Sequence, residues 1–282
     1  IRILLIDISL SAFDKLVGSH TGFRERSGQK EMAKCIAESI ASSYFDSEDN
    51  FRKAIAVIQA GTGIGKSAAY CSTAIAQGLA RNIRVVIATA TVALQEQLMN
   101  KDLPLLAQNM TTPFKYALAK GRGRYLCLMK AEKMAHQMGE DDSDLFEQTS
   151  LLKKSDAQDR AENRQKLAQK MITMYERGEW DGERDSWREN PEGSDWGAVA
   201  ADYHSCTSRH CPFFKDCSYF KARQVLVDAD VIVANHDLVL ATLGTKTLPD
   251  MDRCIVIFDE AHNLPSVALD QFSSSMDLQN LR

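Results

Sequence analysis

A glycine-rich turn followed by lysine and serine is the strongest chemical signal in this 282-residue sequence. The turn consists of Ala60, Gly61, Thr62, Gly63, Ile64, Gly65, Lys66 and Ser67. An apolar run precedes it and a helical pattern follows it, so backbone N–H groups and a helix N-terminus can approach one anion. Lys66 is expected to reach the β- and γ-phosphates of a nucleotide, and Ser67 to bind Mg²⁺. The context favours a nucleotide site over a chance glycine-rich turn.

A second signal is Asp259-Glu260-Ala261-His262, which directly follows the apolar run 254–258. Ligands of open parallel sheets bind at the carboxyl ends of the strands, so these carboxylates are expected beside the phosphates. Asp259 would hold Mg²⁺, mainly through water, and Glu260 would activate the attacking water as a general base. Alone, the four residues could be a polar helix cap. Together with the glycine-rich turn, they favour nucleotide hydrolysis.

Three cysteines, Cys206, Cys211 and Cys217, fall within twelve residues. Their spacing is wider than that of most zinc knuckles, and Cys127 is the best candidate for a fourth ligand. Four thiolates suit either zinc or a 4Fe–4S cluster, and the chemistry of the residues leaves both open. The remaining cysteines are expected to be small buried hydrophobic residues: Cys35, Cys71 and Cys254.

The elements that must position these groups follow an alternating pattern. Helices are predicted over 28–44, from the glycine-rich turn to about residue 80, and from 92 to 99; strands are predicted over 54–59, 83–88, 229–234 and 254–258. Short β-branched runs between helical stretches predict an α/β fold, a parallel sheet with helices on both faces. Residues 118–220 are interpreted as a mostly helical insertion, whose three tryptophans pack its own core.

Composition narrows the function classes. The chain has 34 basic and 38 acidic residues and a formal charge of −4, which excludes a histone-like protein that coats phosphates with its whole surface. No apolar run reaches the length of a membrane-spanning helix, and the opening residues 3–10 do not resemble a secretory signal. Seven cysteines without a sign of export make a disulfide framework unexpected.

These motifs resemble the XPD-like group of iron–sulfur DNA helicases of superfamily 2. The matching pieces run from Phe23 to about Leu269: FRERSGQ, AGTGIGKS, ATATVALQEQL, KDLPLL, GRGRYLC, C-x4-C-x5-C, DADVIVANHDLVL and FDEAH. The resemblance implies a RecA-like motor domain in two parts, 23–117 and 221–282, interrupted by an iron–sulfur insertion over 118–220. Residues 1–22 are then an N-terminal extension, and a second motor domain is absent, as expected of a fragment.

The resemblance also implies a set of sites. ATP and Mg²⁺ are the expected ligands of the glycine-rich turn, where Ala60 replaces the usual first glycine, and Gln29 is the expected adenine contact. Cys127, Cys206, Cys211 and Cys217 would hold a 4Fe–4S cluster. His262 would help to couple hydrolysis to DNA binding. The implied DNA-contacting residues are Thr89, Thr91, Gln95, Asn235 and His236. Independently of the resemblance, Arg122 and Arg124 lie beside Cys127 in a basic loop that could line a channel for a DNA strand.

The implied activity is ATP-driven 5′→3′ unwinding by a monomer in the bacterial cytoplasm. Single-stranded, forked or displaced-strand DNA would be the substrate, with RNA–DNA hybrids as a further candidate. Four alternatives stay open: a close paralogous helicase, a zinc-bearing translocase, an ATP-dependent nuclease and a nucleotide-switched binding module. For Arg122 and Arg124 the physical alternative is pairing with the many nearby acids.

Overall fold

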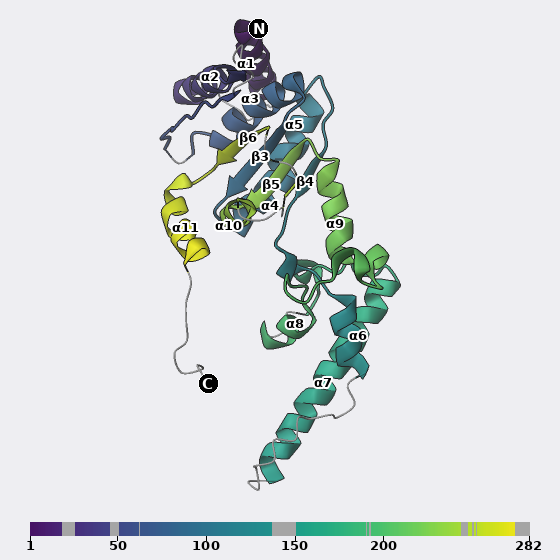
Figure 1. Cartoon of the computed structure of the whole chain (residues 1–282). Helices are drawn as coiled ribbons and strands as arrows, with labels where there is room; N and C mark the ends of the chain where they lie inside the picture. Colours follow the sequence, from purple (N-terminus) through teal and green to yellow (C-terminus); the bar gives the residue numbers. More distant parts are fainter. Residues whose placement is uncertain are drawn as a thin grey trace. The chain divides into compact units, whose positions relative to one another are not determined.

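The computed structural model describes residues 1–18, 26–45, 51–61, 63–136, 151–189, 191, 193–243, 248–249, 251 and 253–273. The chain forms two compact units (Figure 1). Unit 1 combines Ile1–Ala119 with Val225–Arg282, and unit 2 is Lys120–Gln224. That unit 2 is an iron–sulfur domain stays a prediction.

A four-stranded parallel sheet forms the centre of unit 1, in the order β4-β5-β3-β6. The strands are β3 (Arg84–Thr89), β4 (Tyr116–Leu118), β5 (Val231–Asn235) and β6 (Cys254–Phe258). Thr89 lies opposite Asn235, and Ala88 lies opposite Phe258, so three strands end at the same edge. Three of the predicted strands are therefore confirmed, as is the parallel arrangement.

Alternate residues of the strands face opposite layers of helices. Val85, Ile87 and Val231 pack in one cluster with the helices α1 (Arg2–Gly18), α2 (Ser27–Ala41), α3 (Lys66–Arg81) and α5 (Leu103–Asn109). Val86 and Ile232 pack on the other side with α10 (His236–Thr242). The remaining helical elements of unit 1 are α4 (Val92–Gln97), η1 (Leu98–Asp102), η6 (Ala261–Asn263) and α11 (Leu264–Phe272). The predicted α/β class, with helices on both faces, is confirmed.

Helix α1 lies in the N-terminal segment, for which the sequence suggested no role. Phe13 is fully buried in a cluster with Val17, Ala33 and Ala69, which come from α1, α2 and α3. Helix α1 therefore packs against the helix that begins at the glycine-rich turn.

The strand predicted over 54–59 is wrong. The segment is extended but unpaired, and the side chains of Ile55 and Val57 are 87% and 95% exposed. A strand forms only beside a hydrogen-bonded neighbour, and this segment pairs with none of the strands in the described sheet, where β6 is an edge strand. In the same region the short strands β1 (Tyr44–Phe45) and β2 (Phe51–Arg52) pair only with each other.

The expectation for the three non-cluster cysteines holds only in part. Cys71 is buried in α3, and Cys254 is half-buried in β6. Cys35 is exposed, contrary to the expectation. Its neighbours Ala33 and Ile36 occupy the buried face of α2, and the helical rotation places Cys35 on the other side.

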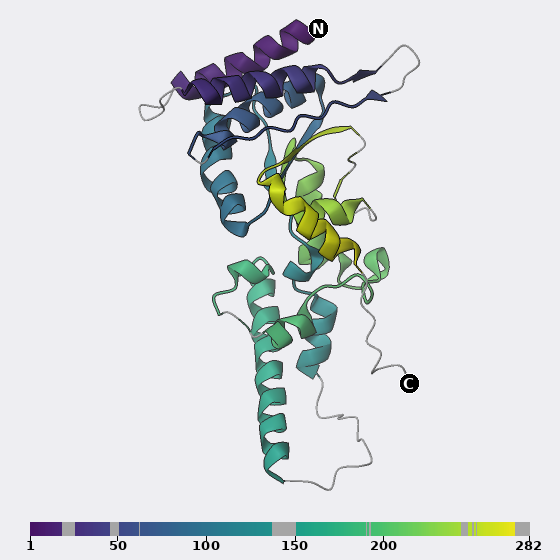
Figure 2. The same cartoon turned by 90° about the vertical axis from the view of Figure 1, so that its left-hand side faces the viewer.

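Unit 2 is mostly helical and has its own small core. Its elements are η2 (Arg122–Arg124), α6 (Leu128–His136), α7 (Leu151–Glu176), η3 (Arg184–Ser186), α8 (Gly193–Val199), η4 (Ser208–His210) and η5 (Phe214–Asp216); α9 (Ser218–Val227) crosses the boundary. Helices α6 and α7 lie side by side (Figure 2). Trp180, Trp187 and Trp196 are buried together, as predicted, with Trp180 and Trp187 ring centroids 4.6 Å apart. Among the helices described in either unit, none is long and apolar enough to cross a membrane.

Candidate nucleotide and nucleic-acid sites

The glycine-rich turn leads directly into α3, which begins at Lys66. Gly63 and Gly65 have φ angles of 77° and 90°, in the left-handed region that glycine adopts at little cost. A Cβ atom on Gly65 would lie 2.5 Å from Nε2 of Gln29. Both the backbone angle and the available space therefore require glycine at this position. Thr62 lies outside the described residues.

Replacing Gly65 by Ala is expected to weaken nucleotide binding at least about tenfold, because a left-handed alanine costs roughly 1–2 kcal/mol. The crowding against Gln29 adds to that cost. Titration with a fluorescent ATP analogue measures the change. Gly197→Ala is the matched control, since nothing lies near its added Cβ and its φ angle is not positive. Unchanged affinity in Gly65→Ala would contradict a tight turn around the phosphates.

Gln29 is almost fully buried, and the structure places it against this turn. Its side-chain Nε2 donates a hydrogen bond to the carbonyl oxygen of Gly65 over 3.0 Å. A buried amide needs such a partner. The contact links α2 to the glycine-rich turn, whereas a contact of Gln29 with adenine stays a prediction.

Asp259 directly follows β6 and lies beside α3, the helix that begins at the glycine-rich turn. Its backbone N–H donates to the carbonyl oxygen of Ala88 over 2.8 Å, which continues the strand ladder. Its Oδ2 accepts a hydrogen bond from the Tyr70 hydroxyl over 3.2 Å, and its Oδ1 accepts one from the Glu260 N–H over 3.1 Å. Burial is the main cause that raises the pKa of Tyr70, so Tyr70 stays a neutral donor. Both oxygens of Asp259 are therefore oriented.

Glu260 faces the lysine of the glycine-rich turn. Its Oε1 lies 2.7 Å from Nζ of Lys66, and its Oε2 lies 3.4 Å from Nδ1 of His262. The hydrogen bond from Lys66 is the largest cause that lowers the pKa of Glu260, so Glu260 carries its negative charge. The φ angle of Glu260 is 53°, an uncommon value for a residue with a side chain. A carboxylate thus lies where Lys66 would meet phosphate oxygens.

Two side chains at this site escaped the sequence analysis. Tyr70 is one helical turn beyond Lys66, so the spacing alone could have placed both on one face of α3. Asp102 ends η1 within the KDLPLL motif. Burial raises the pKa of Asp102, and hydrogen bonds from the side chains of Gln97 and Ser67 partly offset the rise. The position of Asp102 at this site can be found only from the three-dimensional packing.

The predicted DNA contacts Thr89 and Asn235 lie side by side at the ends of β3 and β5. Thr91 is exposed, and its hydroxyl caps α4 by accepting a hydrogen bond from the Leu94 N–H over 3.3 Å. Asn235 caps α10 in the same way, accepting from the Leu238 N–H over 3.0 Å. These caps hold two polar side chains at the strand edge that also carries Asp259.

The predicted residues Gln95 and His236 are buried, unlike Thr91. Nε2 of His236 lies 2.9 Å from the backbone carbonyl oxygen of Asp259, to which it donates. His236 therefore touches the carboxylate strand of the nucleotide site directly, while contact of either side chain with DNA stays a prediction.

The four candidate cluster cysteines are half-buried and belong to unit 2. Burial is the main cause that raises the pKa of Cys217, and backbone hydrogen bonds from Phe220 and Tyr219 lower it, while the charges of Cys127 and Cys206 raise it. Across the described ranges, no three His, Cys, Asp or Glu side chains are grouped as metal ligands. The thiols fit a soft metal by their chemistry, but the structure does not show a closed ligand set.

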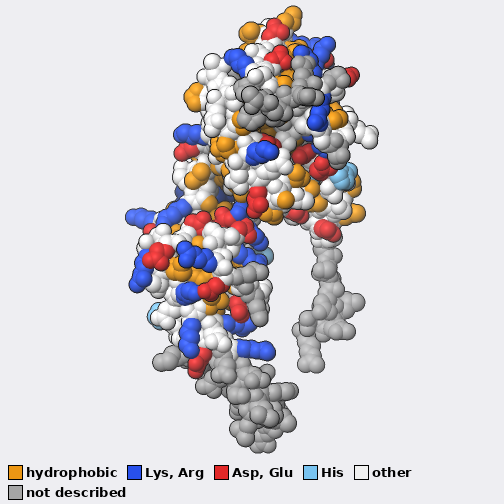
Figure 3. Space-filling model, turned by 180° about the vertical axis from the view of Figure 1, so that it is seen from behind, with side chains coloured by type: hydrophobic (Ala, Val, Ile, Leu, Met, Phe, Trp, Pro, Cys, Tyr) orange, Lys and Arg blue, Asp and Glu red, His pale blue; other side chains and the backbone are white. Residues whose placement is uncertain are grey.

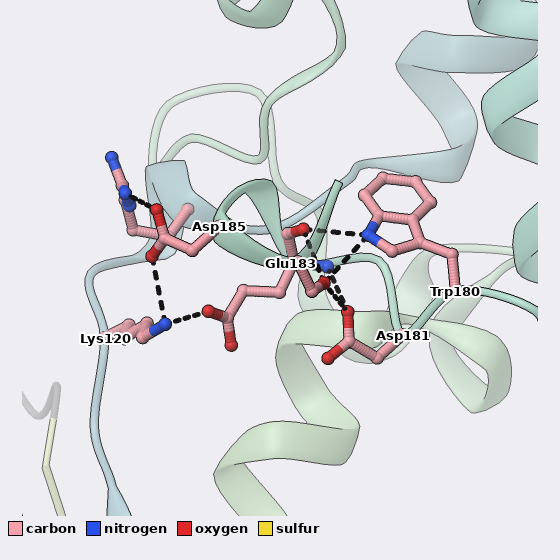
Figure 4. A network of polar contacts seen from close by, with 7 residues as sticks. Lys120, Trp180, Asp181, Glu183 and Asp185 are labelled. Carbon is pink, nitrogen blue, oxygen red and sulfur yellow. Dashed lines mark hydrogen bonds and ion pairs between the residues drawn. The ribbon is translucent and has the colours of Figure 1, made fainter. Parts of the chain in front are cut away.

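Two cations of the GRGRYLC region are paired with acids (Figure 4). Lys120 forms ion pairs with Glu183 and Asp185, the latter over 2.9 Å, and Arg124 pairs with the other oxygen of Asp185. The backbone carbonyl of Glu183 also accepts a hydrogen bond from Nε1 of Trp180 over 2.8 Å. For Arg124, the acid partner that the sequence left open is therefore present. Arg122 has a different environment, of aromatic rings.

Comparisons with known proteins agree with this geometry. The DEAD_2 family model matches residues 205–281. The ATP-dependent DNA helicase DinG of Photobacterium profundum is 38% identical over 270 residues, which cover 95% of this chain and 37% of the relative. DinG of Escherichia coli (strain K12) is 33% identical over 259 residues, covering 91% and 34%. The ATP-dependent DNA helicase YoaA of the same Escherichia coli strain is 31% identical over 266 residues, covering 92% and 36%.

The chain therefore spans 34–37% of the length of these relatives. Its identity to these two DinG helicases, 38% and 33%, exceeds its 31% identity to YoaA. Over 91–95% of its length, this chain is similar to the DinG helicases, at 33–38% identity.

Proposed function

We propose that this chain is the ATP-binding part of a DinG-type DNA helicase. The observation that carries the proposal is the 2.7 Å contact between Lys66 and Glu260, which joins the glycine-rich turn to the carboxylate motif in one site. Sequence motifs nearly two hundred residues apart meet there, as nucleotide hydrolysis requires. The relatives' names support ATP as the nucleotide and DNA as the partner.

The contacts suggest what each residue does when Mg²⁺–ATP binds. Lys66 exchanges the Glu260 carboxylate for the β- and γ-phosphate oxygens. Glu260, released from Lys66, orients the attacking water and accepts its proton. Asp259, oriented by Tyr70, supports Mg²⁺ together with Ser67. The ion pair between Lys66 and Glu260 thereby couples ATP binding to activation of the attacking water.

DNA binding would be coupled to this site through the shared strand edge. Thr91 and Asn235 offer polar side chains for the phosphate backbone, which needs no sequence-specific contact. His236 connects that edge to Asp259 through the backbone carbonyl. We infer 5′→3′ movement on single-stranded DNA and unwinding of forked or displaced-strand DNA in the bacterial cytoplasm.

We further infer that Cys127, Cys206, Cys211 and Cys217 hold a 4Fe–4S cluster. Four half-buried thiols within one unit that has a small core support this, since a metal site can brace such a unit. When bound, the cluster supplies structural cross-linking of the four segments. The competing occupant is zinc, which would leave the protein colourless.

Replacing Cys127 by Ser is expected to reduce bound iron to below about half of the unchanged protein's content and to lower the unfolding temperature of unit 2. Iron and zinc analysis after anaerobic purification, with the visible spectrum, measures the first effect. Cys35→Ser is the matched control, because Cys35 is exposed and lies in unit 1. Stoichiometric zinc without iron in the unchanged protein would contradict the iron–sulfur assignment.

The proposed function as a whole is tested by DNA-stimulated ATP hydrolysis. Lys66→Ala is expected to lower ATP affinity and turnover together, because Lys66 binds phosphate in both the ground and transition states. Lys34→Ala removes the same charge from the exposed face of α2 and is the control. Duplexes with a 5′ or a 3′ single-stranded tail test the direction. Failure of the unchanged protein to bind ATP would contradict the proposal.

A further inference from the structure

Arg122 is surrounded by aromatic rings. Its guanidinium carbon lies 4.3 Å from the ring centroid of Tyr219, 5.9 Å from that of Tyr203 and 6.0 Å from that of Phe220. Within the part of unit 2 that the structure describes, no carboxylate forms an ion pair with Arg122. Stacking on a ring orients a guanidinium while leaving its edge N–H groups able to donate.

The two neighbouring basic side chains differ from Arg122, because each of them has an acidic partner. Lys120 and Arg124 lie within two residues of Arg122, and both are neutralised by Glu183 and Asp185 (Figure 4). The ion pairs of Lys120 and Arg124 thus hold this loop in place. Of the three basic side chains, only Arg122 has no carboxylate accepting from its N–H groups within the described residues of this unit. An anion is the complementary ligand, and a phosphate group that offers two oxygens suits the planar guanidinium best.

Among the aromatic rings around Arg122, that of Tyr219 is buried and held by packing, whereas that of Tyr203 is exposed. Tyr219 is buried and packs against Tyr125 and Phe220, with centroid separations of 5.7 Å and 5.2 Å. Tyr203, by contrast, is 73% exposed. The exposed Tyr203 ring can therefore accept another flat group on its face, beside the guanidinium.

Local sites must account for nucleic-acid affinity in this chain. The formal charge is −4, and on the face that Figure 3 draws, the Lys and Arg side chains are interspersed with Asp and Glu. General electrostatic attraction to a phosphate backbone is therefore weak. An aromatic side chain that stacks on a base, next to an arginine without an acidic partner among the described residues, supplies the affinity for nucleic acid that the overall charge does not.

We propose that Arg122 and Tyr203 form a binding site for one nucleotide of single-stranded DNA. Tyr203 stacks on the base, and Arg122 donates hydrogen bonds to a phosphate of the same strand. Stacking on an aromatic face accepts any base, so the site holds the strand without reading its sequence. This inference rests on the proposed function and assigns a base-stacking role to a residue that the sequence motifs do not include.

Fluorescence anisotropy with a labelled oligo-dT strand tests the proposal. Tyr203→Ala is expected to weaken binding about tenfold, and Tyr203→Phe, which keeps the aromatic face, to stay within about twofold of the unchanged protein. Arg122→Ala is expected to weaken binding and to reduce the slope of log affinity against log salt by about 0.7. Arg160→Ala, an exposed arginine of α7, removes the same charge as a control.

An oligomer of the same length without bases separates stacking from a structural effect. The penalty of Tyr203→Ala should disappear on that strand, whereas the penalty of Arg122→Ala should remain. Equal affinities of Tyr203→Ala and the unchanged protein for oligo-dT, or an equal penalty on both strands, would overturn the inference and leave the ATP site unaffected. If the unchanged protein binds no single-stranded DNA, the proposed function fails with it.

Discussion

Glu260→Gln is expected to slow ATP hydrolysis by about 10²–10⁴-fold, the usual contribution of a positioned general base. ATP affinity should be retained, because the amide removes the carboxylate that competes with phosphate for Lys66. Single-turnover hydrolysis and equilibrium binding of a fluorescent ATP analogue distinguish the two effects. Retained binding with lost turnover is the signature of a group that acts mainly in the transition state.

Glu162→Gln is the matched control for this variant. Glu162 forms only an exposed ion pair with Lys166 on α7, so its replacement should leave both measurements unchanged. A Glu260→Gln variant with full turnover would show that another group activates the water and would contradict the role proposed for Glu260.

Phe13→Ala is expected to destabilise unit 1 by about 3–5 kcal/mol, because Phe13 is fully buried between α1, α2 and α3. Leu4→Ala on the exposed side of the same helix should change stability by less than about 0.5 kcal/mol. Weaker ATP binding should accompany the loss at Phe13, since α3 carries Lys66.

The distribution of tryptophan makes this prediction specific to unit 1. The three tryptophans of the chain all lie in unit 2, so their fluorescence follows the unfolding of that unit, whereas circular dichroism follows both units. Phe13→Ala should move the circular dichroism transition and leave the fluorescence transition in place. No shift in either signal would contradict the packing role of α1.

The sequence predicted the parts of the fold that local pattern determines. The β-branched runs that became β3, β5 and β6 were found because each is apolar along nearly its whole length, as strands between two helical layers are. Lys66 and Glu260 were found because their motifs have few other uses. Helix α1 was not assigned a role, because nothing local indicates that Phe13 contacts α3.

The failures have a common physical cause. Whether an apolar run such as 54–59 becomes a strand depends on a neighbour elsewhere in the chain. Whether Cys35 is buried depends on which face of α2 meets the rest of unit 1. The hydrogen bond from Tyr70 to Asp259 likewise depends on how α3 packs beside β6. Each is a tertiary property that no short stretch of residues encodes.

The unpaired run that contains Ile55 and Val57 has a consequence for handling the protein. Apolar side chains in an extended backbone with free N–H and C=O groups can pair with the same segment of another molecule. The outer edge of β6, where Val256 is partly exposed, offers a second template. This 282-residue polypeptide is therefore expected to aggregate with rising concentration, and light scattering should detect less aggregation after Val57→Lys.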